Sequence, residues 1–175
     1  MTAGSEIPAT GDDVDRIVAA WQRERPDLDV EPLHVLSRIS RIAKEHARMR
    51  ATAFATHGLD GWEFDVLAAL RRAGAPYELS PGQLVAETLV TSGTMTTRVD
   101  RLIERGFVQR RPDPRDRRGV LVQLTPTGQD VVDSALHSLL DHEQALIASL
   151  DPKDRTVLPR ILRELLLASA EATAR

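Results

Sequence analysis

The fold is decided by residues 79–128, which read LSPGQLVAETLVTSGTMTTRVDRLIERGFVQRRPDPRDRRGVLVQLTPTG. Near its start, Ser80, Pro81 and Gln83 have the residue types and the spacing of a helix N-cap, a first helical position and a capping-box partner. These signals predict a short helix from Pro81 to about Thr88.

A second helix is expected after a tight turn, with Ser92 as its N-cap and Gly106 as its stop. Its apolar side chains recur at helical spacing and form an inward stripe of Met95, Val99, Leu102 and Ile103. Its outward face carries short hydroxyls and guanidinium groups, on Thr94, Thr97, Arg98 and Arg101. Two helices joined in this way, with such an outer face, are suited to the major groove of DNA.

Beyond Gly106 the hydrophobic period changes from helical to alternating. Residues 107–111 and 120–124 therefore predict a two-stranded β-hairpin around a loop that is rich in proline and arginine. The loop arginines are Arg115, Arg117 and Arg118. Guanidinium groups enter a narrow minor groove or bind phosphate, and we expect Asp113 and Asp116 to hold them in position. The alternative is a solvated hairpin tip without a partner.

Charge is unevenly distributed along the chain. The 175 residues carry a formal net charge of −3, yet residues 91–119 hold eight arginines against four acidic residues, a local charge of +4. Such a basic segment on an acidic body is typical of a phosphate-binding surface. The chain has no cysteine, which excludes disulfides and thiolate metal sites. Its first residues, MTAGSEIPATGDD, lack the basic start and apolar core of a signal peptide, so we expect a cytoplasmic protein without a membrane span.

Helices are expected on both sides of the hairpin and helix-turn-helix. The predicted organisation is a flexible tail at 1–11, N-terminal helices at 12–58, a winged helix-turn-helix at 59–125 and C-terminal helices at 126–175. Asp60 and Glu63 predict the capped start of a helix before the helix-turn-helix. In the last helix, Pro159 costs about 3 kcal/mol unless the helix kinks or starts late.

Apolar stripes on the outer helices exceed what one small winged helix can cover. They lie at residues 14–21, 131–147 and 157–166. A second copy of the chain would bury them, and a two-fold dimer places two recognition helices roughly 34 Å apart, which predicts an inverted-repeat DNA site. The alternative is a monomer whose helices pack only within the chain.

A helix-turn-helix followed by a hairpin is a winged helix, and the chain resembles the MarR family of transcriptional regulators. The resemblance is carried by residues 59–70, by residues 79–108 and by DPRDRRGVLVQLTPTG, where the basic loop, returning strand and Thr-Pro helix start occur in order. It implies a mostly α-helical fold with a small β-hairpin and a homodimer built from the terminal helices. It also implies a DNA-binding repressor that needs no cofactor and is not an enzyme.

Four residues resemble the ligand set of the urate-responsive branch of that family: Trp21, Asp65, Arg98 and Arg110. The resemblance implies that they bind a small anionic effector, which recruits Arg98 and lowers DNA affinity. Arginine pairs with an organic anion, tryptophan stacks on a planar ring and aspartate accepts ring N–H groups. The alternative is that Asp65 and Arg98 form a structural ion pair, Arg110 contacts phosphate and Trp21 belongs to the dimer core.

The sequence disfavours two other kinds of function. No glycine-rich phosphate loop, nucleophile elbow or His-Glu-x-x-His run occurs, which argues against an enzyme and against a zinc site. A winged-helix adaptor that binds proteins rather than DNA would carry a neutral or acidic recognition face. The arginines and threonines of residues 94–101 favour the DNA-binding regulator, with or without an effector.

Overall fold

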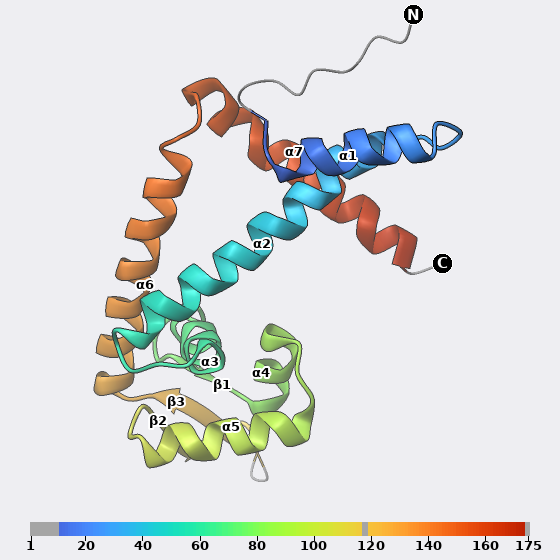
Figure 1. Cartoon of the computed structure of the whole chain (residues 1–175). Coiled ribbons are helices and arrows are strands. Elements are labelled where there is room, and N and C mark those ends of the chain that lie inside the picture. Colours follow the sequence, from blue (N-terminus) through green and yellow to red (C-terminus); the bar gives the residue numbers. More distant parts are fainter. Residues whose placement is uncertain (1–10, 117–118, 174–175) are drawn as a thin grey trace, which may run out of the picture. The chain divides into compact units, whose positions relative to one another are not determined.

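The computed structural model describes residues 11–116 and 119–173, and they divide into two compact units between Arg50 and Ala51. Figure 1 shows the elements in chain order. The helices are α1 (Asp13–Glu24), α2 (Glu31–Ala55), α3 (Gly61–Arg72), α4 (Pro81–Thr88), α5 (Ser92–Glu104), α6 (Pro126–Ile147) and α7 (Pro152–Thr173). The strands are β1 (Glu78–Leu79), β2 (Val108–Pro112) and β3 (Val120–Leu124). No helix within the described ranges is long and apolar enough to cross a membrane.

In the first unit, α1 folds back onto the start of α2. The helix begins at Asp12, whose carboxylate accepts the backbone N–H groups of Val14 and Asp15 at 2.8 and 3.2 Å. Val14 and Val18 face inward and are buried against Val30, which fixes the rotation of α1 about its axis.

Charged side chains join the two helices of this unit along their edge. The Arg38 guanidinium donates to the Asp12 carboxylate at 2.8 Å and to the Asp15 carboxylate at 2.7 Å. These hydrogen bonds hold the pKa of both carboxyl groups below their usual range and raise the pKa of Arg38.

The second unit has its core among α3, α4, α5 and the sheet. Its fully buried side chains come from all four: Val66, Leu67, Leu70, Leu84, Met95, Leu102 and Val122. Each of these helices is amphipathic, so each must bury one face against the others. The Phe54 and Phe64 rings stack with centroids 4.0 Å apart and connect the end of α2 to α3.

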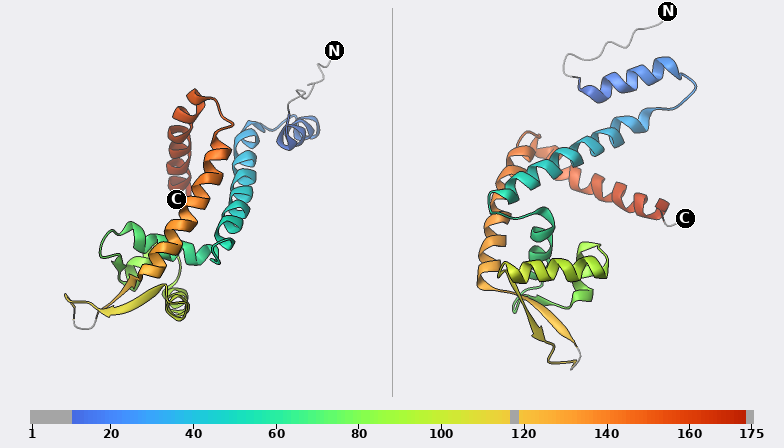
Figure 2. Two further views of the ribbon diagram at one scale, coloured as in Figure 1. Left: turned by 90° about the vertical axis from the view of Figure 1, so that its left-hand side faces the viewer. Right: turned by 60° about the horizontal axis from the view of Figure 1, so that its bottom comes forward.

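The sheet has three antiparallel strands in the order β1-β3-β2. The hairpin that the sequence predicted is present as β2 and β3. The third strand, β1, was not predicted, because it is only two residues long and shows no alternation. Glu78 pairs with Gln123 and Leu79 with Val122. The first hairpin strand also begins and ends one residue later than expected, at Val108 and Pro112. Figure 2 shows β2 and β3 extending away from the helices of this unit toward the wing loop that joins them.

The C-terminal helices differ in how much of their surface is covered. α6 starts at Thr125, whose hydroxyl accepts the Gly128 N–H at 3.0 Å, and it packs against α3 through Val132, Ala135 and Leu139. α7 has no buried residue. It begins at Pro152 and continues through Pro159, so the late start that would have avoided the proline is not adopted.

Gly128 gives a direct test of how α6 meets the wing. A Cβ atom there would lie 2.0 Å from the Phe107 carbonyl oxygen, which is backbone and cannot give way cheaply. Gly128→Ala is expected to destabilise the protein by about 2–3 kcal/mol. Gly61→Ala is the matched control, since nothing lies within 4 Å of a Cβ at that helical position. Urea unfolding of the two variants checks this, and equal stabilities would contradict the packing described.

Candidate nucleic-acid interface

The two faces of α5 lie in different environments. Met95, Val99 and Leu102 are buried on the inner face, as the sequence predicted, and Ile103 is half-buried. On the outer face Thr94, Thr97 and Arg101 are exposed and Arg98 is half-buried; Ser92, the first residue of the helix, is also exposed. Packing of the inner face therefore fixes which side chains α5 presents.

The N-cap of α5 is Thr91, not the predicted Ser92. The Thr91 hydroxyl accepts the Thr94 N–H at 3.3 Å and lies 2.9 Å from the Thr94 hydroxyl. Both candidates carry a capping hydroxyl, but Thr91 has the extended backbone of an N-cap, with φ −77° and ψ 157°. The helix thus begins with Ser92 as its first residue.

Threonine hydroxyls on α5 are oriented by the helix itself. Thr97 donates to the Gly93 carbonyl at 3.3 Å, and Thr96 donates to the Ser92 carbonyl at 3.1 Å. A hydroxyl whose proton is used in this way still offers its oxygen lone pairs. On the outer face these oxygens are acceptors for base amino groups or for water.

Arg98 is held against an aromatic ring. Its guanidinium lies over the Trp62 indole, 5.4 Å from the ring centroid, which is a cation–π distance. Around this contact is a hollow of about 350 Å³ lined by Trp62, Thr94, Thr97, Arg98 and Arg101. The hollow combines two cations, two hydroxyls and one flat apolar surface, a set that suits an anion with a planar part.

The wing loop is shaped by backbone hydrogen bonds. The Asp113 carboxylate accepts the Arg115 N–H at 2.8 Å, and the Gly119 N–H donates to the Asp116 carbonyl at 2.8 Å. The Asp113 carboxylate therefore helps to shape the backbone of the loop that carries the arginines. The Arg115 side chain is exposed. Arg117 and Arg118 lie outside the described residues.

Arginines at the base of the wing have partners. Arg110 pairs with Asp100 of α5 at 2.8 Å. Arg111 donates to the Gln123 side chain at 3.3 Å and approaches Glu78 at 4.0 Å. The Arg110–Asp100 pair therefore joins β2 to the recognition helix, a role that the sequence did not reveal.

The four residues assigned to an effector are distributed over both units. Asp65 is exposed on α3, and Arg98 and Arg110 make the contacts with Trp62 and Asp100 given above. Trp21 belongs to the first unit, where it is 49% exposed on α1. Within the described residues no group of three or more His, Cys, Asp or Glu side chains is placed to hold a metal ion.

A helix-turn-helix with a basic outer face, followed by an antiparallel hairpin with an arginine-bearing loop, defines a winged-helix DNA-binding domain. Comparisons with known proteins assign the family. Residues 57–119 match the model of the MarR family. The chain is 37% identical to the HTH-type transcriptional regulator PecS of Dickeya dadantii over 150 residues, 86% of this chain and 90% of that protein. It therefore belongs to the MarR family of transcriptional regulators, as the sequence motifs indicated.

Solved structures agree with this assignment. The Escherichia coli MarR mutant C80S complexed with operator DNA has a TM-score of 0.65 and 29% identity, over 79% of this chain and 99% of that one. Bordetella bronchiseptica BpsR, whose DNA binding is regulated by 6-hydroxynicotinic acid, has a TM-score of 0.62 and 28% identity, over 75% and 91%. The expected fold, mostly α-helical with a small sheet, is confirmed.

The observed cap of α5 predicts that two neighbouring hydroxyls contribute differently to the stability of the protein. Thr91→Ala removes the acceptor of the Thr94 N–H and is expected to cost about 1 kcal/mol of stability. Ser92→Ala, one residue along, is the control and is expected to change the free energy of unfolding by less than about 0.5 kcal/mol. Denaturant unfolding measures the stability of both variants. A larger loss of stability in Ser92→Ala would show that Ser92 is the N-cap.

Proposed function

We propose that this chain is a repressor that binds an inverted-repeat operator as a homodimer in the cytoplasm. The observation that carries the proposal is the division of α5 into a buried apolar face and an outer face of hydroxyls and arginines, continued by the arginine-bearing wing loop. The likeness to a MarR structure complexed with operator DNA supports it.

In this proposal α5 enters the major groove and the wing reaches the adjoining minor groove. The α5 contacts come from Ser92, Thr94, Thr97, Arg98 and Arg101, and the wing contacts from Arg115, Arg117 and Arg118. Threonine and arginine side chains read base edges in the major groove. Arginine side chains suit the negative potential of a narrow minor groove.

The dimer is proposed from the uncovered apolar surface of the outer helices. None of the residues of α7 is buried, although it carries a helical series of large apolar side chains: Val157, Leu158, Ile161, Leu162, Leu165 and Leu166. Exposure of so many apolar side chains on one helix is unfavourable in water and marks an association surface. We assign residues 12–58 and 126–175 to dimerisation and residues 59–125 to DNA binding.

The wing is tested through the salt dependence of binding. Arg115→Ala removes an exposed cation and is expected to weaken binding to every duplex and to reduce the slope of log K against log salt by roughly one. Arg25→Ala, an exposed arginine paired with Asp27 in the first unit, makes the same charge change as a control. Fluorescence anisotropy at several salt concentrations measures the slopes. Equal slopes for Arg115→Ala and the wild type would remove Arg115 from the DNA surface.

We infer that the effector is a small planar anion bound by Trp21, Asp65, Arg98 and Arg110. The support is chemical: Arg98 is half-buried over an indole, so an anion that recruits its guanidinium changes a contact of the recognition helix itself. The DNA binding of BpsR, a protein of similar structure, is regulated by 6-hydroxynicotinic acid, which is a small planar acid. The coupling between ligand and DNA is expected to be about 1–3 kcal/mol.

The effector site is tested by variants outside the proposed DNA surface. Asp65→Ala is expected to weaken the binding of urate or 6-hydroxynicotinate by about tenfold or more, because it removes a hydrogen-bond acceptor. Trp21→Phe is expected to weaken it less, because phenylalanine keeps a smaller stacking surface. Operator affinity without ligand is expected to stay within about twofold of wild type. Isothermal titration measures ligand binding, with Glu164→Gln on α7 as the control. Wild-type ligand affinity in the double variant would contradict this site.

A further inference from the structure

Glu63 is the one charged residue that is buried within the described ranges, at 3% exposure. It lies in the first turn of α3, where its Oε2 accepts the Asp60 N–H at 2.9 Å. The same oxygen accepts a hydrogen bond from Arg105 Nη1 at 2.6 Å. A buried carboxylate is costly unless it is paired and hydrogen-bonded, so Glu63 depends on this arginine.

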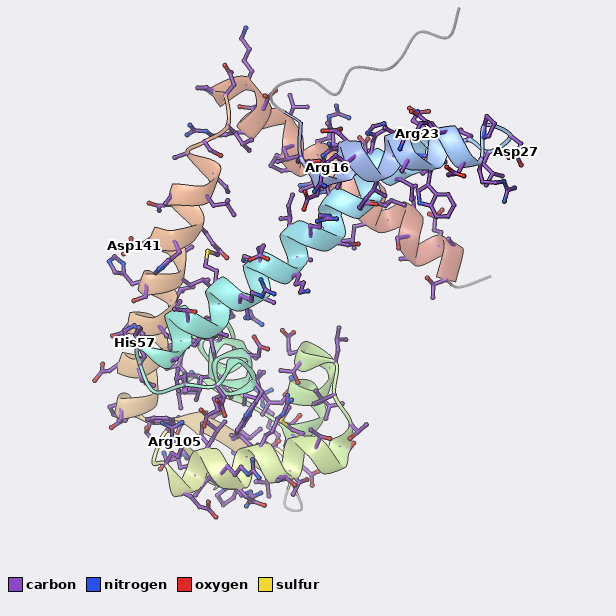
Figure 3. The ribbon with its side chains drawn as sticks, viewed as in Figure 1. Arg16, Arg23, Asp27, His57, Arg105 and Asp141 are labelled. Atoms are coloured by element: carbon purple, nitrogen blue, oxygen red, sulfur yellow. The ribbon has the colours of Figure 1, made fainter. Side chains whose placement is uncertain are left out.

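The Arg105 guanidinium makes two further contacts, because it lies where α5 ends. Its Nη2 donates to the Gly58 carbonyl at 2.8 Å. Its guanidinium carbon lies 4.6 Å from the centroid of the Phe107 ring, just before β2. Figure 3 shows Arg105 at the end of α5, on the same side as the segment that holds His57. One side chain thus connects the recognition helix, the base of the wing, the start of α3 and the turn after α2.

The turn after α2 is itself constrained. Gly58 adopts φ +66°, a conformation that favours glycine, and the Leu59 N–H donates back to the Phe54 carbonyl at 3.0 Å. The Gly58 carbonyl therefore has a fixed position from which to accept Arg105. The end of α5 is anchored to backbone on one side and to a buried carboxylate on the other.

We infer that Glu63 and Arg105 are positioning residues for DNA recognition, which fix the end of α5 and the base of the wing to the α2–α3 turn. Because both hold backbone segments that carry the DNA-contacting side chains, they set the alignment of α5 relative to the wing. Neither has to touch DNA for this role, which rests on the proposed function. Alignment matters for base contacts, whereas attraction to phosphates tolerates misplacement.

A second ion pair in the same unit provides a matched control. Arg71 and Asp133 join α3 to α6 through three hydrogen bonds of 2.9 to 3.2 Å. The two arginines are about equally exposed, but the Asp133 side chain is 48% exposed whereas that of Glu63 is 4% exposed, and neither Arg71 nor Asp133 lies on α5 or the wing. If Glu63 only stabilised the fold, its loss would change DNA affinity in the same way as loss of the Arg71–Asp133 pair.

The test compares Glu63→Gln and Arg105→Lys with Asp133→Asn in the full-length protein. Affinities are measured for an operator selected from random duplexes and for an unrelated duplex, at a temperature where circular dichroism shows each variant folded. Glu63→Gln is expected to lose about tenfold in operator affinity and less than about twofold on the unrelated duplex, with an unchanged salt slope. Arg105→Lys is expected to show the same pattern, because lysine cannot hold Glu63 and Gly58 together. Asp133→Asn is expected to leave the ratio of the two affinities unchanged.

Three outcomes would overturn the inference. The first is a folded Glu63→Gln variant whose affinity ratio equals that of the wild type. The second is a change of roughly one in the salt slope of Arg105→Lys, which would make Arg105 a phosphate contact. The third is an equal loss of the affinity ratio in Asp133→Asn. If Glu63→Gln does not fold, Arg105→Lys alone decides. A wild-type protein that does not distinguish the two duplexes would instead contradict the proposed function.

Discussion

The rest of the DNA-binding unit depends on burial of one face of α5. Met95, Val99 and Leu102 are buried where α5 packs in the core with α4 and β2, and this packing fixes the rotation of α5 about its own axis. With that rotation fixed, the threonines and arginines of residues 94–101 lie on the outer face of α5, away from the core. A polar substitution at the inner face would therefore damage recognition through packing, without touching a residue that meets DNA.

Electrostatic pairing then decides which arginines are available. The chain is acidic overall, and its basic segment at 91–119 contains arginines of three kinds. Some are exposed, as Arg101 and Arg115 are; others are paired within the fold, as Arg110 is with Asp100 and Arg105 with Glu63. Arg98 lies between these classes because it rests on an indole. A ligand that competes for Arg98 therefore acts on the recognition helix directly, which is the physical basis of the proposed regulation.

Local signals in the sequence were sufficient for much of the fold. The capping box at Ser80 and Gln83 placed α4 correctly, because a cap depends only on residues three positions apart. The two-residue strand β1 was missed, since it is formed by pairing with β3 and has no pattern of its own. The pairs Glu63–Arg105 and Arg110–Asp100 were missed for a related reason: they join residues that are distant in sequence or on different elements, and no periodicity marks them. Thr91 and Ser92 both carry a capping hydroxyl, and only the backbone distinguishes them, because Thr91 is extended and Ser92 is already helical.

Footprinting would show whether α5 and the wing together form the DNA surface of a two-fold dimer. The purified protein would be bound to a duplex selected from a random pool, and protection of bases and of the sugar-phosphate backbone would be mapped on both strands. We expect two symmetric half-sites whose centres are about 10 base pairs apart or a multiple of that, each with major-groove protection flanked by minor-groove protection. A single asymmetric half-site, or uniform protection without sequence selection, would contradict this arrangement.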